Sequence, residues 1–273
     1  MSTATAGPVV PGRPGWLNRL GWTLADTGTI TRRNLVTILR VPVAVFFLII
    51  QPVMFVLLFR YVFGGAIHIH GTDYVNYLMP GIFVQTVCLG AVTTGVGLSE
   101  DLHKGLIERF RALPMARSAV LGGRTTADLI RNVFVVAIMT GVGFAAGFRP
   151  TTSVAEFGAG LLVLLLFAWT LGWGFAIIGL SAPNSEAAQV MSFALIFPLT
   201  FASSAFVPVF TMPGWLQPFA ANQPVSIVVD AARSLMLGGI FTNDADVVKA
   251  LLWCVGLLCV FAPLAVRRYL SAN

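Results

Sequence analysis

Long apolar runs separated by short polar links dominate the pattern of this chain. One run, residues 157–180, holds 24 residues without a charged side chain, enough to cross a hydrocarbon layer about 30 Å thick. Runs of this kind predict six transmembrane helices, so we expect an all-α integral membrane protein. The expected spans are Pro42–Phe63, Tyr77–Leu98, Thr126–Phe148, Phe157–Leu180, Ala187–Val207 and Val247–Val266.

Local signals predict where two of these helices begin. Ser153 followed by Glu156 is a capping box for the fourth span. Thr125 or Thr126 can cap the third span after two glycines, which places Asp128 in its first turn. We therefore expect the segment before Thr125 to be a loop.

Composition agrees with a membrane protein, since only 10% of the 273 residues are charged and the mean hydropathy is +0.85; a soluble domain carries about 25% charged residues. The basic residues also predict orientation: 13 of the 17 fall on one set of alternate links. The positive-inside rule places that set in the cytoplasm. We expect a multi-pass plasma-membrane protein with both termini cytoplasmic.

Two links have amphipathic patterns. Residues 1–41 form an N-terminal cytoplasmic segment that ends in an expected interfacial helix, with Arg32, Arg33 and Arg40 on its polar side. Residues 42–270 form the membrane domain. In the long cytoplasmic link, apolar residues recur at helical spacing from Leu102 to Leu113 before Pro114 ends the helix. So short a helix needs a membrane surface or a protein partner.

The link between the fifth and sixth spans, residues 208–242, contains four prolines and predicts short helices outside the membrane. One of them, 225–238, places Asp230 and Arg233 on one face.

Several chemistries are absent from the sequence. A phosphate-binding loop needs Gly-Lys-Ser/Thr, and neither Lys104 nor Lys249 follows a glycine. We expect no catalytic residue, bound metal or cofactor. His68, His70 and Asp73 on an outer link could serve a membrane enzyme acting on lipids, but a solvated loop explains them better.

No ionisable residue is expected near the middle of a span, which argues against a proton- or sodium-coupled carrier. Energy would then come from outside the membrane. A lightly hydroxylated apolar lining favours a lipophilic or amphiphilic cargo. The candidate substrate path comprises Phe83, Gln85, Thr86, Thr93, Ser192, Phe197 and Ser203.

Three blocks, in order along the chain, resemble the type-2 ABC exporter permeases of the daunorubicin- and doxorubicin-resistance type. The first is 77–86 (YLMPGIFVQT); the second joins 100–105 (EDLHKG), 107–114 (IERFRALP) and 122–129 (GGRTTADL); the third joins 206–209 (FVPV), 212–218 (MPGWLQP) and 222–226 (NQPVS). Gln223 interrupts the family's Asn-Pro pair. The resemblance extends from about residue 40 onward.

The resemblance implies a permease that is not itself an enzyme and works in multidrug export and antibiotic resistance. It implies a second permease chain, identical or paralogous, and a separate ATP-binding-cassette subunit that holds ATP and Mg²⁺. Membrane lipid would surround the pair, and no nucleic acid is expected. The implied surface that couples to the ATPase consists of Leu106, Glu108, Arg109, Phe110, Arg111 and Pro114. An ion-coupled carrier or a channel remains the alternative.

Overall fold

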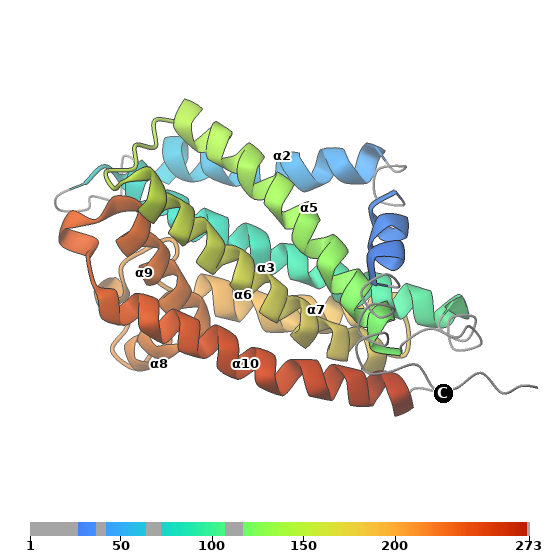
Figure 1. Ribbon diagram of the computed structural model, residues 1–273. Coiled ribbons are helices and arrows are strands. Elements are labelled where there is room, and N and C mark those ends of the chain that lie inside the picture. The colour runs from blue at the N-terminus through green and yellow to red at the C-terminus, as the bar shows by residue number, and fades with distance from the viewer. Residues whose placement is uncertain (1–26, 37–41, 64–71, 107–116, 272–273) are drawn as a thin grey trace, which may run out of the picture.

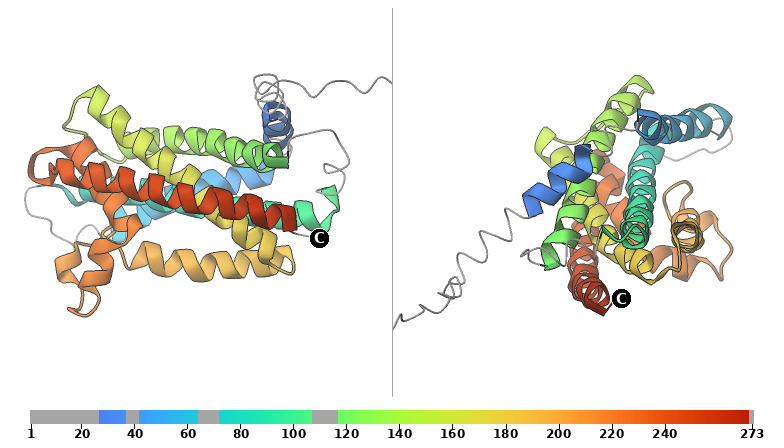
Figure 2. Two further views of the ribbon diagram at one scale, coloured as in Figure 1. Left: turned by 60° about the horizontal axis from the view of Figure 1, so that its bottom comes forward. Right: turned by 90° about the vertical axis from the view of Figure 1, so that its right-hand side faces the viewer.

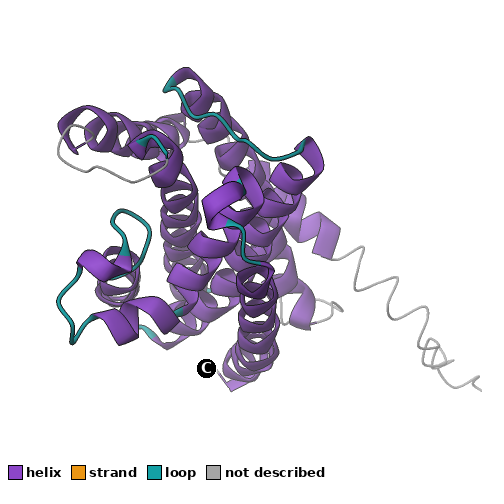
Figure 3. Cartoon of the chain, turned by 90° about the vertical axis from the view of Figure 1, so that its left-hand side faces the viewer, coloured by secondary structure: helices purple, strands orange, loops and turns teal. Residues whose placement is uncertain are grey.

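The computed structural model describes residues 27–36, 42–63, 72–106 and 117–271, and this part of the chain is helical without any strand (Figure 1, Figure 3). The helices are α2 (Pro42–Leu58), the π-helix η1 (Phe59–Phe63), α3 (Tyr74–His103), α5 (Arg117–Ala145), α6 (Val154–Ser181), α7 (Ser185–Phe201), η2 (Val209–Thr211), α8 (Gln217–Asn222), α9 (Pro224–Leu237), η3 (Gly239–Phe241) and α10 (Asp244–Ser271), together with a helical segment at 27–36. The sequence-based prediction of an all-α fold is confirmed.

Within these residues, four helices are long and apolar enough to cross a membrane: Tyr74–His103, Leu121–Ala145, Val154–Ser181 and Asp244–Ser271. Two further apolar helices, Ile50–Val62 and Ser185–Phe201, are shorter. All six fall where the sequence predicted spans. The division between residues 41 and 42 into two domains stays a prediction.

Helix α3 is the centre of the bundle. In its most apolar stretch 72% of the residues are buried, against 11% for α10, which lies at the periphery. The helices α2, α5, α6, α7 and α9 all pack on α3. The main core gathers around the middle of α3, and a second apolar cluster, which includes Leu98, Leu121 and Tyr269, fills the end of the bundle near the C-terminus.

Glycines allow α3 to approach its neighbours at backbone distance. A Cβ atom on Gly179 of α6 would collide with the carbonyl oxygen of Gly95, and one on Gly81 would collide with that of Ala205. At Gly95 the added atom would lie 2.7 Å from the carbonyl oxygen of Phe175. Small residues of this kind are typical of tightly packed membrane helices.

The capping box at the start of α6 is confirmed: Ser153 and Glu156 exchange hydrogen bonds of 2.9 and 3.2 Å. The expected start of the third span is wrong. Helix α5 begins at Arg117, and the Thr125 hydroxyl donates to the carbonyl oxygens of Leu121 and Gly122 inside the helix rather than capping it. Apolar and polar positions of 117–125 continue the helical period that starts beyond Thr125, so no loop intervenes.

The long link between the second and third spans is correspondingly shorter than predicted, since α3 extends to His103. The amphipathic helix expected from Leu102 to Leu113 can be followed only to Leu106, because residues 107–116 lie outside the described residues, as do His68 and His70. The thiols of Cys88 and Cys254 are buried, whereas Cys259 on α10 is exposed.

We expect Gly179→Ala to lower the apparent melting temperature of the detergent-purified protein, because overpacking costs about 1–3 kcal/mol. Gly141→Ala is the matched control, since its added methyl group meets nothing within 4 Å. Equal melting temperatures for the two variants would contradict the close approach of α3 and α6.

Candidate transport site

Among the described residues, two of the hollows are lined by polar groups from elements distant in sequence. The inner hollow, between α2 and α3, has a volume of about 70 Å³. The outer pocket, at the end of the bundle where α6 begins, has a volume of about 660 Å³. The first contains residues that the sequence singled out, and the second was not predicted.

The inner hollow combines hydroxyl, amide and apolar groups. Its lining is Gln51, Pro52, Phe55, Gln85, Thr86, Leu89, Gly90 and Thr93. Three of the seven candidate path residues, Gln85, Thr86 and Thr93, therefore lie together because their spacing brings them to one face of α3. The Thr86 hydroxyl donates to the Ile82 carbonyl at 2.7 Å, which leaves its oxygen lone pairs directed elsewhere.

The other path residues do not reach this hollow. Phe83 is fully buried in the main core, edge-on to Phe148 at 6.3 Å between ring centroids. Ser192 and Ser203 are also fully buried, and their hydroxyls donate to backbone carbonyls of Ala188 and Thr200. Alternating polar residues along an apolar helix do not reveal which of them face inward, so the sequence grouped core and lining together.

Phe197 lies on a different surface. It is 44% exposed on α7 and stacks between Phe193 and Phe201, at 5.3 and 5.7 Å between ring centroids. Phe201 stacks in turn on Phe206, which stacks on Phe59 of η1 at 4.6 Å. This row of stacked rings connects η1 to α7 through Phe206.

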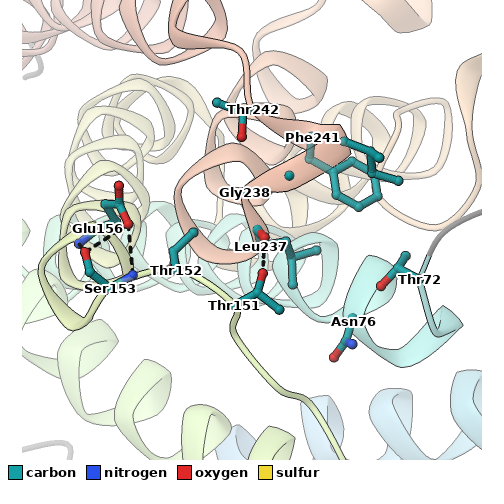
Figure 4. Close-up of a pocket in the computed structure, with 12 residues that line it drawn as sticks. Thr72, Asn76, Thr151, Thr152, Ser153, Glu156, Leu237, Gly238, Phe241 and Thr242 are labelled. Atoms are coloured by element: carbon teal, nitrogen blue, oxygen red, sulfur yellow. Dashed lines mark hydrogen bonds between the residues drawn. The ribbon is translucent and has the colours of Figure 1, made fainter.

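The outer pocket is built where three segments meet (Figure 4). Its lining is Thr72, Asn76, Thr151, Thr152, Ser153, Glu156, Leu237, Gly238, Gly239, Ile240, Phe241 and Thr242. Five threonine or serine hydroxyls, an amide and one carboxylate face it alongside Phe241 and two aliphatic side chains. Such a lining can hold a hydroxylated polar group beside an apolar one.

Side-chain to backbone hydrogen bonds fix the shape of the outer pocket. The Thr151 hydroxyl donates to the Leu237 carbonyl, and the Thr152 hydroxyl donates to the Leu235 carbonyl at 2.8 Å. Gly238 and Gly239 adopt φ values of 58° and 57°, which favour glycine. The Thr-Thr-Ser run and the Gly-Gly pair were the sequence signals that could have indicated this pocket.

Beside the outer pocket, α9 contains a buried arginine. Arg233 is 2% exposed, and its guanidinium pairs with Asp230 at 2.9 Å, as the three-residue spacing predicted. It also donates to the carbonyl oxygens of Tyr77, Ser204 and Ala205 and lies 3.6 Å from the centroid of the Tyr77 ring. A single side chain thus joins α9, α3 and the segment after α7.

A second buried ion pair corrects the expectation that no charge lies near the middle of a span. Arg131 is the fifteenth of the 29 residues of α5, is 8% exposed, and pairs with Asp128 at 2.9 Å. The expected span 126–148 contains both residues near its start, because the start of α5 was set too late. Asp128 also accepts a hydrogen bond of 2.6 Å from Thr94, so its charge is compensated within the bundle.

Of the expected coupling surface, only Leu106 lies among the described residues, half-buried after the end of α3; Glu108, Arg109, Phe110, Arg111 and Pro114 lie outside them. Just before it, Lys104 donates to Glu100 at 2.9 Å, and this hydrogen bond raises the pKa of the lysine. Of the expected interfacial arginines, Arg32 is exposed and Arg33 half-buried on the 27–36 helix, and Arg40 is outside the described residues.

The described residues form an apolar helical bundle with polar-lined hollows, an arrangement that suits a membrane transporter. The ABC-2 type transporter family matches residues 25–237. The daunorubicin resistance ABC transporter permease protein DrrB1 of Streptomyces coeruleorubidus is 35% identical over 91% of this chain and 88% of its own. The probable doxorubicin resistance ABC transporter permease protein DrrC of Mycobacterium tuberculosis is 28% identical over 93% of this chain and 91% of its own.

A third relative, the putative transport permease ycf38 of Pyropia yezoensis, is 29% identical over 82% of this chain and 80% of its own. The chain belongs to the ABC-2 type transporter family and is the permease subunit of an ABC exporter. The resemblance seen in the sequence is confirmed, and it favours ATP over an ion gradient as the source of energy.

Arg233→Gln should destabilise the bundle, because three carbonyls would lose their donor and Asp230, which is 38% exposed, would lose its charged partner; a buried acceptor left without a donor costs about 1–3 kcal/mol. The check is the apparent melting temperature in detergent. Arg149→Gln, which removes a more exposed arginine that also donates to two carbonyls, should shift stability by less than about 1 kcal/mol. A similar fall in melting temperature for both variants would show that the Arg233 contacts stabilise the bundle no more than the Arg149 contacts do.

Proposed function

We propose that this permease exports lipophilic drugs, antibiotics or lipids, powered by a separate ATP-binding subunit. The observation that carries the proposal is the match to two drug-resistance permeases over most of the length of each chain. The inner hollow supports it, since mixed apolar and hydroxyl linings suit amphiphilic molecules. At about 70 Å³ this hollow would contact only part of such a molecule, whether a drug or a lipid.

In this proposal six helices cross the membrane, with α2–η1 and α7 as the two beyond the four long helices. Helix α7 has 17 residues, which span about 25 Å and leave its ends near the polar boundary. The end that carries the 27–36 helix, Lys104, Arg124 and Arg268 faces the cytoplasm (Figure 2). With that orientation both termini would be cytoplasmic, and the plasma membrane is the location that we propose.

The ATPase partner would dock at the same basic end and would bind ATP and Mg²⁺ there. The sequence of this permease has no phosphate-binding loop of its own with which to bind ATP. The amphipathic segment from Leu106 to Pro114 would enter a groove of the partner, with Glu108, Arg109 and Arg111 fixing the orientation.

A second permease chain, identical or paralogous, would cover the face formed by α2 and α7. Exposed apolar side chains occupy this face, which the row of stacked aromatic rings unites: Phe46, Met54, Leu57, Val190, Leu195, Phe197 and Phe201. The inner hollow opens beside α2. Pairing of two permease chains through this face would therefore enclose a common path between the inner hollow of one chain and that of the other.

Co-expression is the first test. Membranes that contain this chain and its ATPase should export daunorubicin and show drug-stimulated ATP hydrolysis, because the permease supplies the path and the partner the energy. Membranes with the chain alone should show neither activity. Drug-stimulated hydrolysis by the purified chain alone, or export that persists after ATP is depleted, would refute the division of labour.

Thr86→Val is a narrower test of the inner hollow. Loss of one cargo hydrogen bond, worth about 0.5–1.5 kcal/mol, should reduce daunorubicin export by the co-expressed complex roughly two- to tenfold. Thr140→Val is the matched control, because its hydroxyl makes the same bond within its own helix, at 2.8 Å, away from the hollow. Equal export by both variants would remove Thr86 from the path.

A further inference from the structure

Paired charges form a continuous series from the 27–36 helix into the middle of the bundle. Arg33 lies 3.8 Å from Asp101 at the end of α3, and Asp101 lies 3.1 Å from Arg124 of α5. Arg124 lies 3.7 Å from Asp128, which pairs with Arg131 at 2.9 Å. The side chain of Arg33 is 38% exposed, those of Asp101 and Arg124 are 20% and 18% exposed, and those of Asp128 and Arg131 are 5% and 9% exposed.

The outer members of the series are held at one end by the 27–36 helix. The Thr31 hydroxyl donates to the Gly123 carbonyl of α5 at 3.1 Å. A Cβ atom on Gly123 would lie 2.6 Å from the Cβ atom of Ile30, so the Ile30 side chain packs directly against the backbone of α5. This helix crosses the end of the bundle that the proposed function assigns to the ATPase (Figure 2).

At its other end the series reaches the inner hollow. The guanidinium of Arg131 donates to the Thr93 hydroxyl and, at 2.8 Å, to the Gly90 carbonyl. Thr93 and Gly90 both line that hollow. Arg131, on α5, therefore contacts two residues of α3 that form the wall of the inner hollow.

The packing leaves these side chains little freedom to rearrange independently. A Cβ atom on Gly97 would collide with the Arg124 guanidinium, and one on Gly90 would lie 2.6 Å from the Asn132 side chain. A buried ion pair contributes little net stability compared with well-packed apolar residues. Stability alone therefore does not explain several consecutive charges here, whereas transmission of position from one charge to the next does.

We propose that Asp128 and Arg131 are positioning residues that couple the 27–36 helix to the inner hollow, so that a shift of this helix reshapes the wall formed by Gly90 and Thr93. The inference rests on the proposed function in one respect, the assignment of the ATPase to this end of the bundle.

The test uses the permease–ATPase complex in membrane vesicles, with a single reporter cysteine, Thr86→Cys, after replacement of the three native cysteines. The measurement is the rate of maleimide labelling with and without ATP and vanadate. Coupled sites typically influence each other about 5- to 150-fold. We expect a nucleotide effect of at least about fivefold in the parent and below about twofold in Asp128→Asn/Arg131→Gln, which removes both charges together.

Two milder variants at opposite ends of the series, Asp101→Asn and Thr93→Val, keep the test decisive if the double variant does not insert. Each should reduce the nucleotide effect, and together they should reduce it less than additively, as residues of one network do. A purely structural role would lower the melting temperature without this pattern.

Asp246→Asn/Lys249→Gln is the matched control, since it removes an exposed pair with the same three-residue spacing. It should leave the labelling response unchanged. An undiminished response in Asp101→Asn and Thr93→Val, or no nucleotide response in a parent complex that exports daunorubicin, would overturn the coupling. Loss of daunorubicin export with the response retained would instead count against the proposed cargo.

Discussion

The fold depends on how closely α3 can approach its neighbours. In an apolar solvent, helices gain little from burying apolar surface against one another, so close packing of their backbones must hold them together. Glycines on α3 and α6 allow that contact, and α5, α7 and α9 then complete a shell around α3. The buried charges are possible because this shell excludes lipid and supplies partners for each of them.

The sequence was sufficient for the fold class and for the position of each apolar helix, because long apolar runs have few alternatives. It failed at helix ends where no strong stop signal exists. Gly122 and Gly123 look like a loop, yet α5 passes through them because the glycines admit the 27–36 helix against its side. Short-range signals do not record that tertiary contact.

The site was predicted less well than the fold. A sequence shows which polar residues lie within an apolar run but not the face to which they turn, so Phe83 and Thr86 looked equivalent. The outer pocket escaped prediction because its walls come from three segments that only the folded bundle brings together. Arg131 fell near the start of the expected span 126–148, rather than near the middle of a helix, because that helix was begun too late.

The hydrogen bonds of Thr151 and Thr152 to the last carbonyls of α9 have a mechanical consequence. Carbonyls at a helix end have no partner within their own helix, and separating them from these hydroxyls would leave them unsatisfied. The turn between α5 and α6 is therefore held to the end of α9 by hydrogen bonds. Any motion of this turn would therefore have to include the end of α9 as well.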